Sequence, residues 1–116
     1  RDRSPSRGLG DVYKRQIIDD FKLWLKSNEE RILQQGLRLV DVYKNITEKE
    51  IEKSVVYTYE NFKYISQLTI RNDGYINIEL LQKDSEEMVF YMYCKTDKKI
   101  MFESLFDNYL YYISQN

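Results

Sequence analysis

The side chains of this chain that could perform acid–base or metal chemistry are its carboxylates. They occur in close groups along the sequence: Asp19/Asp20, Glu29/Glu30, Glu48/Glu50/Glu52 and Glu86/Glu87. Paired carboxylates can share a proton in general acid–base catalysis, or bind a divalent cation. Each group nevertheless lies in a charged segment that we expect to be exposed, where carboxylate pKa values stay ordinary. We therefore interpret these groups as solvated surface.

The other residue types that carry out chemistry are scarce. The chain has no histidine, which removes the commonest general base and every Ser/His or Cys/His nucleophile pair. Its one cysteine, Cys94, cannot build a thiolate zinc site. Gly36 and Gly74 are isolated and form no phosphate-binding loop. The sequence therefore predicts no catalytic residue, no cofactor and no metal, and an enzyme is not expected.

Residues 1–16 do not have the character of natural protein sequence. Segment 6–16, Ser-Arg-Gly-Leu-Gly-Asp-Val-Tyr-Lys-Arg-Gln, back-translates into a DNA adapter used to prepare sequencing libraries, and residues 1–3 resemble the end of the same adapter in another frame. Segments of this kind are excluded from fold reasoning. We interpret residues 1–16 as a non-native adapter-derived segment and residues 17–116 as a single α+β domain whose natural start is missing.

Without that segment the sequence is acidic. Residues 1–16 hold five of the 18 basic and two of the 19 acidic side chains, which leaves 13 basic against 17 acidic and a formal charge of −4. Phosphate binding needs clustered Lys and Arg, so we expect a basic protein rather than nucleic acid as partner. No apolar run approaches the roughly 20 residues of a membrane span, so no membrane association is expected. A single cysteine fits a reducing compartment, the cytoplasm.

Apolar residues at helical spacing predict two helices. The first covers residues 17–35 and is expected to end at Gly36 in a left-handed C-cap. The second begins after a cap at Thr96 or Asp97 and ends near Ile113. Trp24 is expected to pack near Leu68, Ile78 or this closing helix. The apolar faces are Ile18, Phe21, Trp24/Leu25, Asn28 and Ile32 in the first helix, and Phe102, Phe106, Tyr109/Leu110 and Ile113 in the second.

Five segments between the helices are rich in strand-forming residues: 37–44, 54–59, 62–71, 75–81 and 88–94. The connection 45–53 carries Thr47-x-x-Glu50, a pattern that can cap one helical turn. Asp73-Gly74 is the strongest hairpin signal. Because short loops make neighbouring strands antiparallel, we predict an α+β fold: an N-terminal helix, an antiparallel β-meander of four to five strands and a C-terminal helix, with both helices on one sheet face.

Alternation within the strands assigns side chains to the two faces of this sheet. In strand 37–44 we expect Leu37, Leu39, Asp41 and Tyr43 on one side and Arg38, Val40 and Val42 on the other. In strands 62–71 and 75–81 the core face is predicted to hold Phe62, Tyr64, Ser66, Leu68, Ile70, Ile76, Ile78 and Leu80. The opposite face then carries Gln67, Thr69, Arg71, Tyr75, Asn77 and Glu79.

This uncovered face is either an ordinary solvated surface or a platform for a protein partner. Tyr and Arg are enriched at interface hot spots, which favours recognition, whereas AT-rich codon usage can also account for many of the tyrosines. As protein-binding residues we select first Arg71, Tyr75, Asn77 and Glu79, and second Tyr57 and Tyr59. Glu79 is expected to pair with a neighbour such as Arg71 or Lys63.

Several spaced motifs resemble the small bacterial immunity proteins of the TriTu family. They are Phe21-x-x-Trp24-x-x-x-Asn28, Ile32-x-x-x-Gly36-Leu37, Glu60-Asn61-x-Lys63-Tyr64-Ile65-x-x-Leu68-Thr69 and Gly74-x-x-x-Ile78-Glu79. The resemblance covers nearly all of residues 17–113. It implies a single-domain protein of a polymorphic toxin system. Such a protein neutralises a cognate protein toxin by stoichiometric binding, and we expect this chain to be a monomer. The alternative is a small acidic secretion or assembly chaperone, which we would expect to dimerise.

Overall fold

A computed structural model describes residues 17–49, 51–95 and 99–115, with the side chains of 99–102 left out of the description. Residues 17–27 form a helix, here called helix 17–27, and α2 (Glu29–Gln34) follows it. Five strands come next, and α3 (Lys99–Gln115) closes the chain. The strands are β1 (Arg38–Ile46), β2 (Glu52–Glu60), β3 (Tyr64–Arg71), β4 (Tyr75–Gln82) and β5 (Met88–Lys95). No helix in the described ranges is both long and apolar enough to cross a membrane.

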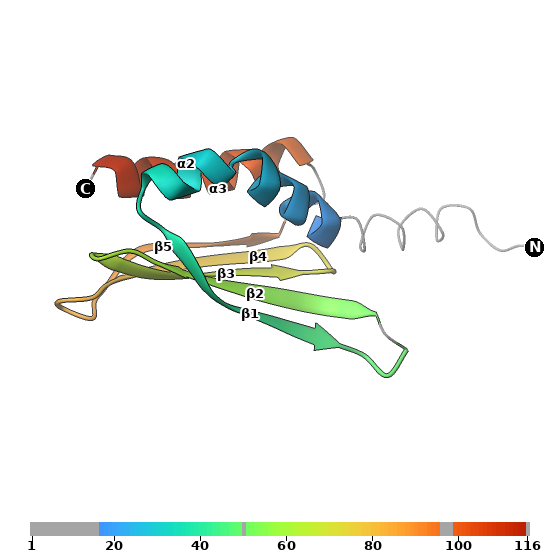
Figure 1. Ribbon diagram of the computed structural model, residues 1–116. Coiled ribbons are helices and arrows are strands. Elements are labelled where there is room, and N and C mark those ends of the chain that lie inside the picture. Colours follow the sequence, from blue (N-terminus) through green and yellow to red (C-terminus); the bar gives the residue numbers. More distant parts are fainter. Residues whose placement is uncertain (1–16, 50, 96–98, 116) are drawn as a thin grey trace, which may run out of the picture.

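The strands form one antiparallel sheet in the order β1-β2-β3-β4-β5, so each strand pairs with its neighbour in sequence. Figure 1 shows the helices together on one side of this sheet and no helix on the other side. We call the uncovered side the open face. The predicted α+β meander with both helices on one face is confirmed.

The first helical stretch is interrupted at Asn28, within the continuous helix that the sequence predicts for residues 17–35. Asn28 has φ −112° and ψ 19°, outside helical values. Its backbone N–H and its side-chain amide both donate to the carbonyl of Trp24, at 3.0 and 2.9 Å. Asn side chains that bond to nearby backbone compete with the regular helical ladder, which explains the break.

Gly36 ends α2 as predicted. Its φ is +73°, a left-handed conformation that costs glycine little. The N–H of Leu37 donates to the carbonyl of Ile32 at 3.3 Å, and that of Gly36 to Leu33 at 2.9 Å, which satisfies carbonyls at the helix end. The chain therefore turns sharply from α2 into β1, which places the helix over the sheet.

The core lies between the helices and the covered face of the sheet. Phe21 and Trp24 each pack on Phe106 of α3, with ring centroids 5.1 Å apart in both pairs. The expected contact of Trp24 with the closing helix is thus confirmed. From the sheet come the predicted residues Tyr64, Ser66, Leu68, Ile70, Ile76, Ile78 and Leu80, and from α3 the predicted Phe106, Tyr109, Leu110 and Ile113, all of them buried. The predicted cap at Thr96 or Asp97 lies outside the described residues.

The face assignment of β1 is wrong beyond Leu39, because the strand contains a bulge. Leu39 pairs with Tyr59 but Asp41 pairs with Thr58, so Val40 is an extra residue on β1. One extra residue reverses the alternation that follows it. Asp41 and Tyr43 therefore lie on the open face with Thr58 and Val56, while Val42 packs toward the core with Tyr57.

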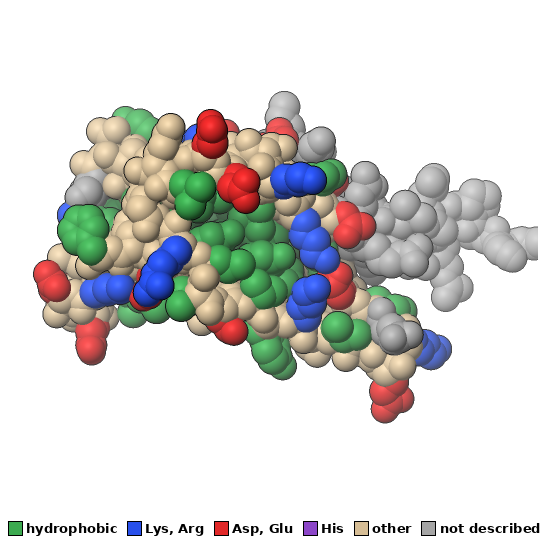
Figure 2. Space-filling model, viewed as in Figure 1, with side chains coloured by type: hydrophobic (Ala, Val, Ile, Leu, Met, Phe, Trp, Pro, Cys, Tyr) green, Lys and Arg blue, Asp and Glu red, His purple; other side chains and the backbone are tan. Residues whose placement is uncertain are grey.

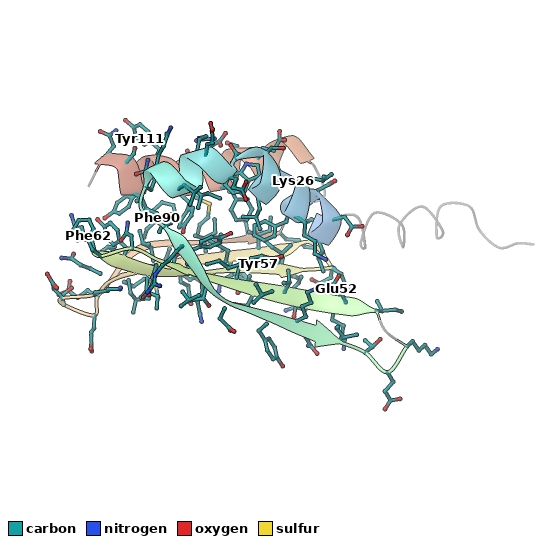
Figure 3. The ribbon with its side chains drawn as sticks, in the orientation of Figure 1. Lys26, Glu52, Tyr57, Phe62, Phe90 and Tyr111 are labelled. Atoms are coloured by element: carbon teal, nitrogen blue, oxygen red, sulfur yellow. The ribbon has the colours of Figure 1, made fainter. Side chains whose placement is uncertain are left out.

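Phe62 is the second wrong assignment: it was predicted in the core and is 92% exposed. Asn61 explains the difference, because its side-chain oxygen accepts hydrogen bonds from the N–H groups of Lys63 and Tyr64, at 2.9 and 2.7 Å. This Asx turn delays the start of β3 to Tyr64 and leaves Phe62 at the tip of the turn. Figure 3 shows Phe62 at the end of the sheet.

The remaining connections are hairpin turns. Thr47 does not cap a helix; its hydroxyl accepts hydrogen bonds from the N–H groups of Lys49 and Ile51, at 3.3 and 3.1 Å, within a tight turn. Glu50 lies outside the described residues. Because this connection is tight, β1 and β2 extend to Ile46 and Glu52, further than predicted. Gly74 has φ +99° in the β3–β4 turn, as the Asp-Gly signal indicates.

Candidate functional site: two surfaces for a protein partner

The open face is built from the residues that alternate with the core positions of the five strands. Cross-strand pairing brings Tyr43, Val56, Thr69, Asn77 and Tyr93 into one row across the sheet. The next row is Asp41, Thr58, Gln67, Glu79 and Tyr91. Three tyrosines of these rows, Tyr43, Tyr91 and Tyr93, are 55–61% exposed. The open face is therefore a polar surface with large aromatic side chains.

Tyr75 lies at one end of this surface, between two cations and a second ring. Its ring stacks on that of Tyr93 with centroids 5.6 Å apart and planes 18° apart. The guanidinium carbon of Arg71 lies 5.1 Å from the centroid of the Tyr75 ring, and the Lys95 ammonium lies 5.4 Å from it. Cations near an aromatic ring are attracted to its face. These contacts hold the Tyr75 ring in one orientation on the open face.

The structure brings four of the six predicted binding residues together. Arg71, Tyr75, Asn77 and Glu79 all lie on the open face of β3 and β4. Arg71 pairs with Asp73 at 2.6 Å, rather than with Glu79 as expected. The side-chain oxygen of Asn77 is buried and has no hydrogen-bond partner among the described residues.

The other two selected residues, Tyr57 and Tyr59, lie on the opposite side of the sheet from these four. Tyr57 pairs with Leu68 and Tyr59 with Ser66, both core positions, because β2 alternates in step with β3. The Tyr57 ring meets Phe21 edge-on at 5.2 Å. Figure 3 shows Tyr57 beneath the helices. Sequence reasoning had fixed the faces of β3 and β4 but had not carried the register across to β2.

Both tyrosines line a groove of about 570 Å³ between the helical layer and strands β1 and β2. Burial raises the pKa of Tyr59 to about 12, and burial also raises the pKa of Tyr57. Both hydroxyls therefore remain protonated at neutral pH and can donate hydrogen bonds. The lining is Lys22, Leu25, Lys26, Glu29, Ile32, Leu33, Leu37, Arg38, Leu39, Tyr57 and Tyr59. Figure 2 shows it as a hollow with an apolar floor and basic side chains beside it.

Neither surface has the residues of a catalytic or metal site. Within the described ranges no three Cys, Asp or Glu side chains gather closely enough to hold a metal ion. Burial raises the pKa of the Cys94 thiol, which makes it a weaker nucleophile. Hydrogen bonds from Lys83 and Arg38 lower the pKa of Glu60, so this carboxylate acts as an anion that joins β2 to two neighbouring segments.

Sequence reasoning missed three residues of the open face: Tyr43, Tyr91 and Tyr93. Tyr43 was missed because of the bulge at Val40: simple alternation places Tyr43 on the same side of the sheet as Leu37. Tyr91 and Tyr93 could have been found from the alternation of β5, where Phe90, Met92 and Cys94 pack toward the core.

Comparison with known proteins agrees with this arrangement. A sequence model of the family described as "Immunity protein TriTu" matches residues 19–112, which is most of the chain. No curated protein and no solved structure matches. The matched range begins in helix 17–27, includes all five strands and ends in α3. The chain therefore belongs to the TriTu family of immunity proteins of polymorphic toxin systems, a family that is generally not enzymatic.

Proposed function

We propose that this chain neutralises a cognate bacterial toxin by binding it directly and stoichiometrically through the open face. The observation that carries the proposal is the cluster of oriented aromatic and charged side chains on that face, centred on the Tyr75–Tyr93 stack. Tyr and Arg supply much of the energy at protein interfaces when they sit in desolvated centres. We assign the main contacts to Arg71, Tyr75, Asn77 and Glu79.

Inhibition of a toxin by binding needs no catalytic residue. An immunity protein needs a rigid surface complementary to its toxin, and a five-stranded sheet backed by a layer of helices provides rigidity. The formal charge of −4 on residues 17–116 accelerates encounter with a basic toxin domain. Family membership favours this function over the chaperone alternative.

We further propose that the domain acts as a monomer of residues 17–116, in the bacterial cytoplasm. Its single free thiol, Cys94, suits a reducing compartment. A monomer leaves the whole open face available to the toxin. Light scattering coupled to size exclusion tests this point: a chaperone-like dimer that covers the open face would contradict it.

The function is tested in cells that express the toxin domain encoded next to this gene. Co-expression of the chain should restore growth, whereas Tyr75→Ala and Glu79→Lys variants should fail to restore it with unchanged circular dichroism. Tyr111→Ala is the matched control, because Tyr111 is an exposed tyrosine on α3, in the helical layer. Loss of protection in the control, or full protection by both open-face variants, would contradict the assignment of the open face.

A further inference from the structure

The two edge strands of the sheet, β1 and β5, each have one side without a neighbouring strand. An edge strand leaves a row of backbone N–H and C=O groups unpaired, and proteins usually block such a row with charged side chains or bulges. β1 is blocked in both ways, because the bulge at Val40 interrupts its register and it carries Arg38, Asp41 and Lys44. The β1 edge is therefore protected against pairing with a further strand.

The β5 edge lacks this protection. β5 has no charged side chain from Met88 to Cys94. Its extra residue, Val89, lies near the start of the strand, and residues 90–95 pair with β4 in unbroken register. No backbone hydrogen bond joins the outer side of this stretch to another described segment. A regular edge of this kind is a template for one more strand.

Hydrogen bonding in the β4–β5 hairpin decides which backbone groups lie on that edge. The N–H of Gln82 donates to the carbonyl of Glu87 at 2.9 Å, so Gln82 directs its N–H toward β5. Alternate residues of a strand direct their backbone groups to the same side, so every second residue of β4 back to Ile76 also faces β5. The residues of β5 opposite them face β4 in turn. Tyr91 and Tyr93, which alternate with those residues, therefore direct their N–H and C=O groups to the free edge.

The same two residues place their side chains on the open face. Tyr91 and Tyr93 are each 55% exposed, and the ring of Tyr93 stacks on that of Tyr75. Because Tyr93 belongs to the edge strand itself, a toxin that covers this stack lies beside the free edge. One partner can therefore contact the rings and the edge together.

The turn that leads into β5 is acidic. It carries Lys83, Asp84, Glu86 and Glu87, all of them exposed. Lys83 pairs with Glu60 at 2.9 Å, which leaves the three carboxylates of the turn without an ion-pair partner among the described residues. A basic side chain at one end of an added strand would be attracted to them.

We propose that the edge of β5 binds an extended segment of the toxin, which becomes a sixth strand of the sheet. The segment bonds to the backbone of Tyr91 and Tyr93, has uncharged side chains beside their rings, and places a basic side chain next to the β4–β5 turn. Backbone hydrogen bonds give affinity in this mode of recognition, and side chains give specificity.

This inference rests on the proposed function for the identity of the partner, and on the free backbone groups of β5 for the extended conformation. The formal charge of −4 on residues 17–116 favours a basic toxin over a second copy of the chain, because two acidic copies repel each other.

Hydrogen exchange of the labelled full chain, followed by NMR, tests the added strand. In the free chain the N–H groups of Tyr91 and Tyr93 should exchange rapidly, and those of Met92 and Cys94, which face β4, slowly. The purified toxin domain should slow exchange at Tyr91 and Tyr93 by about tenfold or more. Rapid exchange at both residues within a formed complex would overturn the proposal and leave the proposed function intact, whereas the absence of any complex would overturn both. Slow exchange at both without toxin, in a chain that light scattering shows to be a dimer, would assign the edge to a second copy instead.

A pair of variants at one position separates the backbone from the ring. Tyr91→Pro and Tyr91→Ala both remove the ring, but only Tyr91→Pro removes the N–H, and proline is tolerated where an edge N–H faces solvent. Toxin affinity should be about tenfold lower for Tyr91→Pro than for Tyr91→Ala. Equal affinities of two variants with the circular dichroism of the parent would contradict the added strand. The exchange measurement decides alone if the proline variant does not fold.

The acidic turn is tested by charge reversal. Glu87→Lys should weaken toxin binding by about fivefold or more. Glu48→Lys is the matched control, because it makes the same change of charge in the exposed β1–β2 turn, beside the protected edge. Equal losses for the two variants would mean that only net charge matters, and would contradict the basic side chain assigned to the end of the segment.

Discussion

The side-chain amide of Asn61 donates a hydrogen bond of 2.9 Å to the backbone carbonyl of Gln35, and so ties the β2–β3 turn to the end of α2. The oxygen of the same amide accepts from the N–H groups of Lys63 and Tyr64. Asn61 is buried, and Gly36 lies against it: a Cβ added to Gly36 would sit 3.7 Å from the Asn61 Cβ. One side chain thus fixes how the first helical segment meets the sheet.

Asn61→Ala should therefore lower the free energy of unfolding by about 2 kcal/mol or more, because it leaves backbone groups without partners. Urea denaturation measures the change. Phe62→Ala is the adjacent control and should shift stability by no more than about 0.5 kcal/mol, since that ring is in water. An Asn61→Ala variant as stable as the parent would show that water replaces these bonds without cost.

Trp24 is expected to anchor the first helical segment, because it is buried against Phe106. Trp24→Ala should cost about 3–5 kcal/mol through lost burial and a residual cavity. The emission of the folded protein should lie at the short wavelengths of a buried indole and move to longer wavelengths on unfolding. Leu23→Ala, on the exposed side of the same helix, should be nearly neutral. Emission typical of an indole in water would refute the packing.

Buried tyrosines should make the fold sensitive to alkali. Burial raises the pKa of Tyr59 from 10.0 to about 12. Burial also raises the pKa of Tyr109, whose hydroxyl bonds to Ser66. The unfolded chain therefore releases these protons first, and the free energy of unfolding should fall as pH rises from about 10 to about 12. Denaturation at a series of pH values measures the slope, which Tyr59→Phe should reduce. A flat profile across this window would be inconsistent with the burial.

If residues 1–16 are adapter-derived, the chain without them should unfold at nearly the same temperature as the whole chain. Differential scanning calorimetry of both forms makes the comparison. A fall of several degrees on deletion would mean that the segment packs on the domain, and would remove the case for residues 17–116 as the folding unit.

The predictable parts of the fold are those with a regular period and a glycine at each critical turn. The core positions of β3 and β4 follow simple alternation. Gly36 and Gly74 both have the positive φ that the end of α2 and the β3–β4 turn require. The exceptions arise from single residues that change the local register. Val40 is bulged out of β1, Asn61 delays β3, and Asn28 bonds to its own helix.

The sequence predicted the sheet face of a site residue only where alternation within a single strand decides that face. Arg71, Tyr75, Asn77 and Glu79 share a face because β3 and β4 are regular and joined by a tight turn. The sequence analysis assigned no face to Tyr57 and Tyr59, because their face depends on cross-strand register, which alternation within β2 alone does not specify. The groove depends on how far the helices reach over the sheet, a matter of packing that no short motif encodes.

The central claim is that the chain binds its toxin through the open face, and isothermal titration calorimetry with the purified toxin domain tests it most directly. We predict a one-to-one complex that weakens with added salt, an affinity loss of about 2 kcal/mol or more for Tyr75→Ala, and no loss for Tyr111→Ala. Equal affinities for the parent and Tyr75→Ala, or no binding by the parent chain, would contradict the claim.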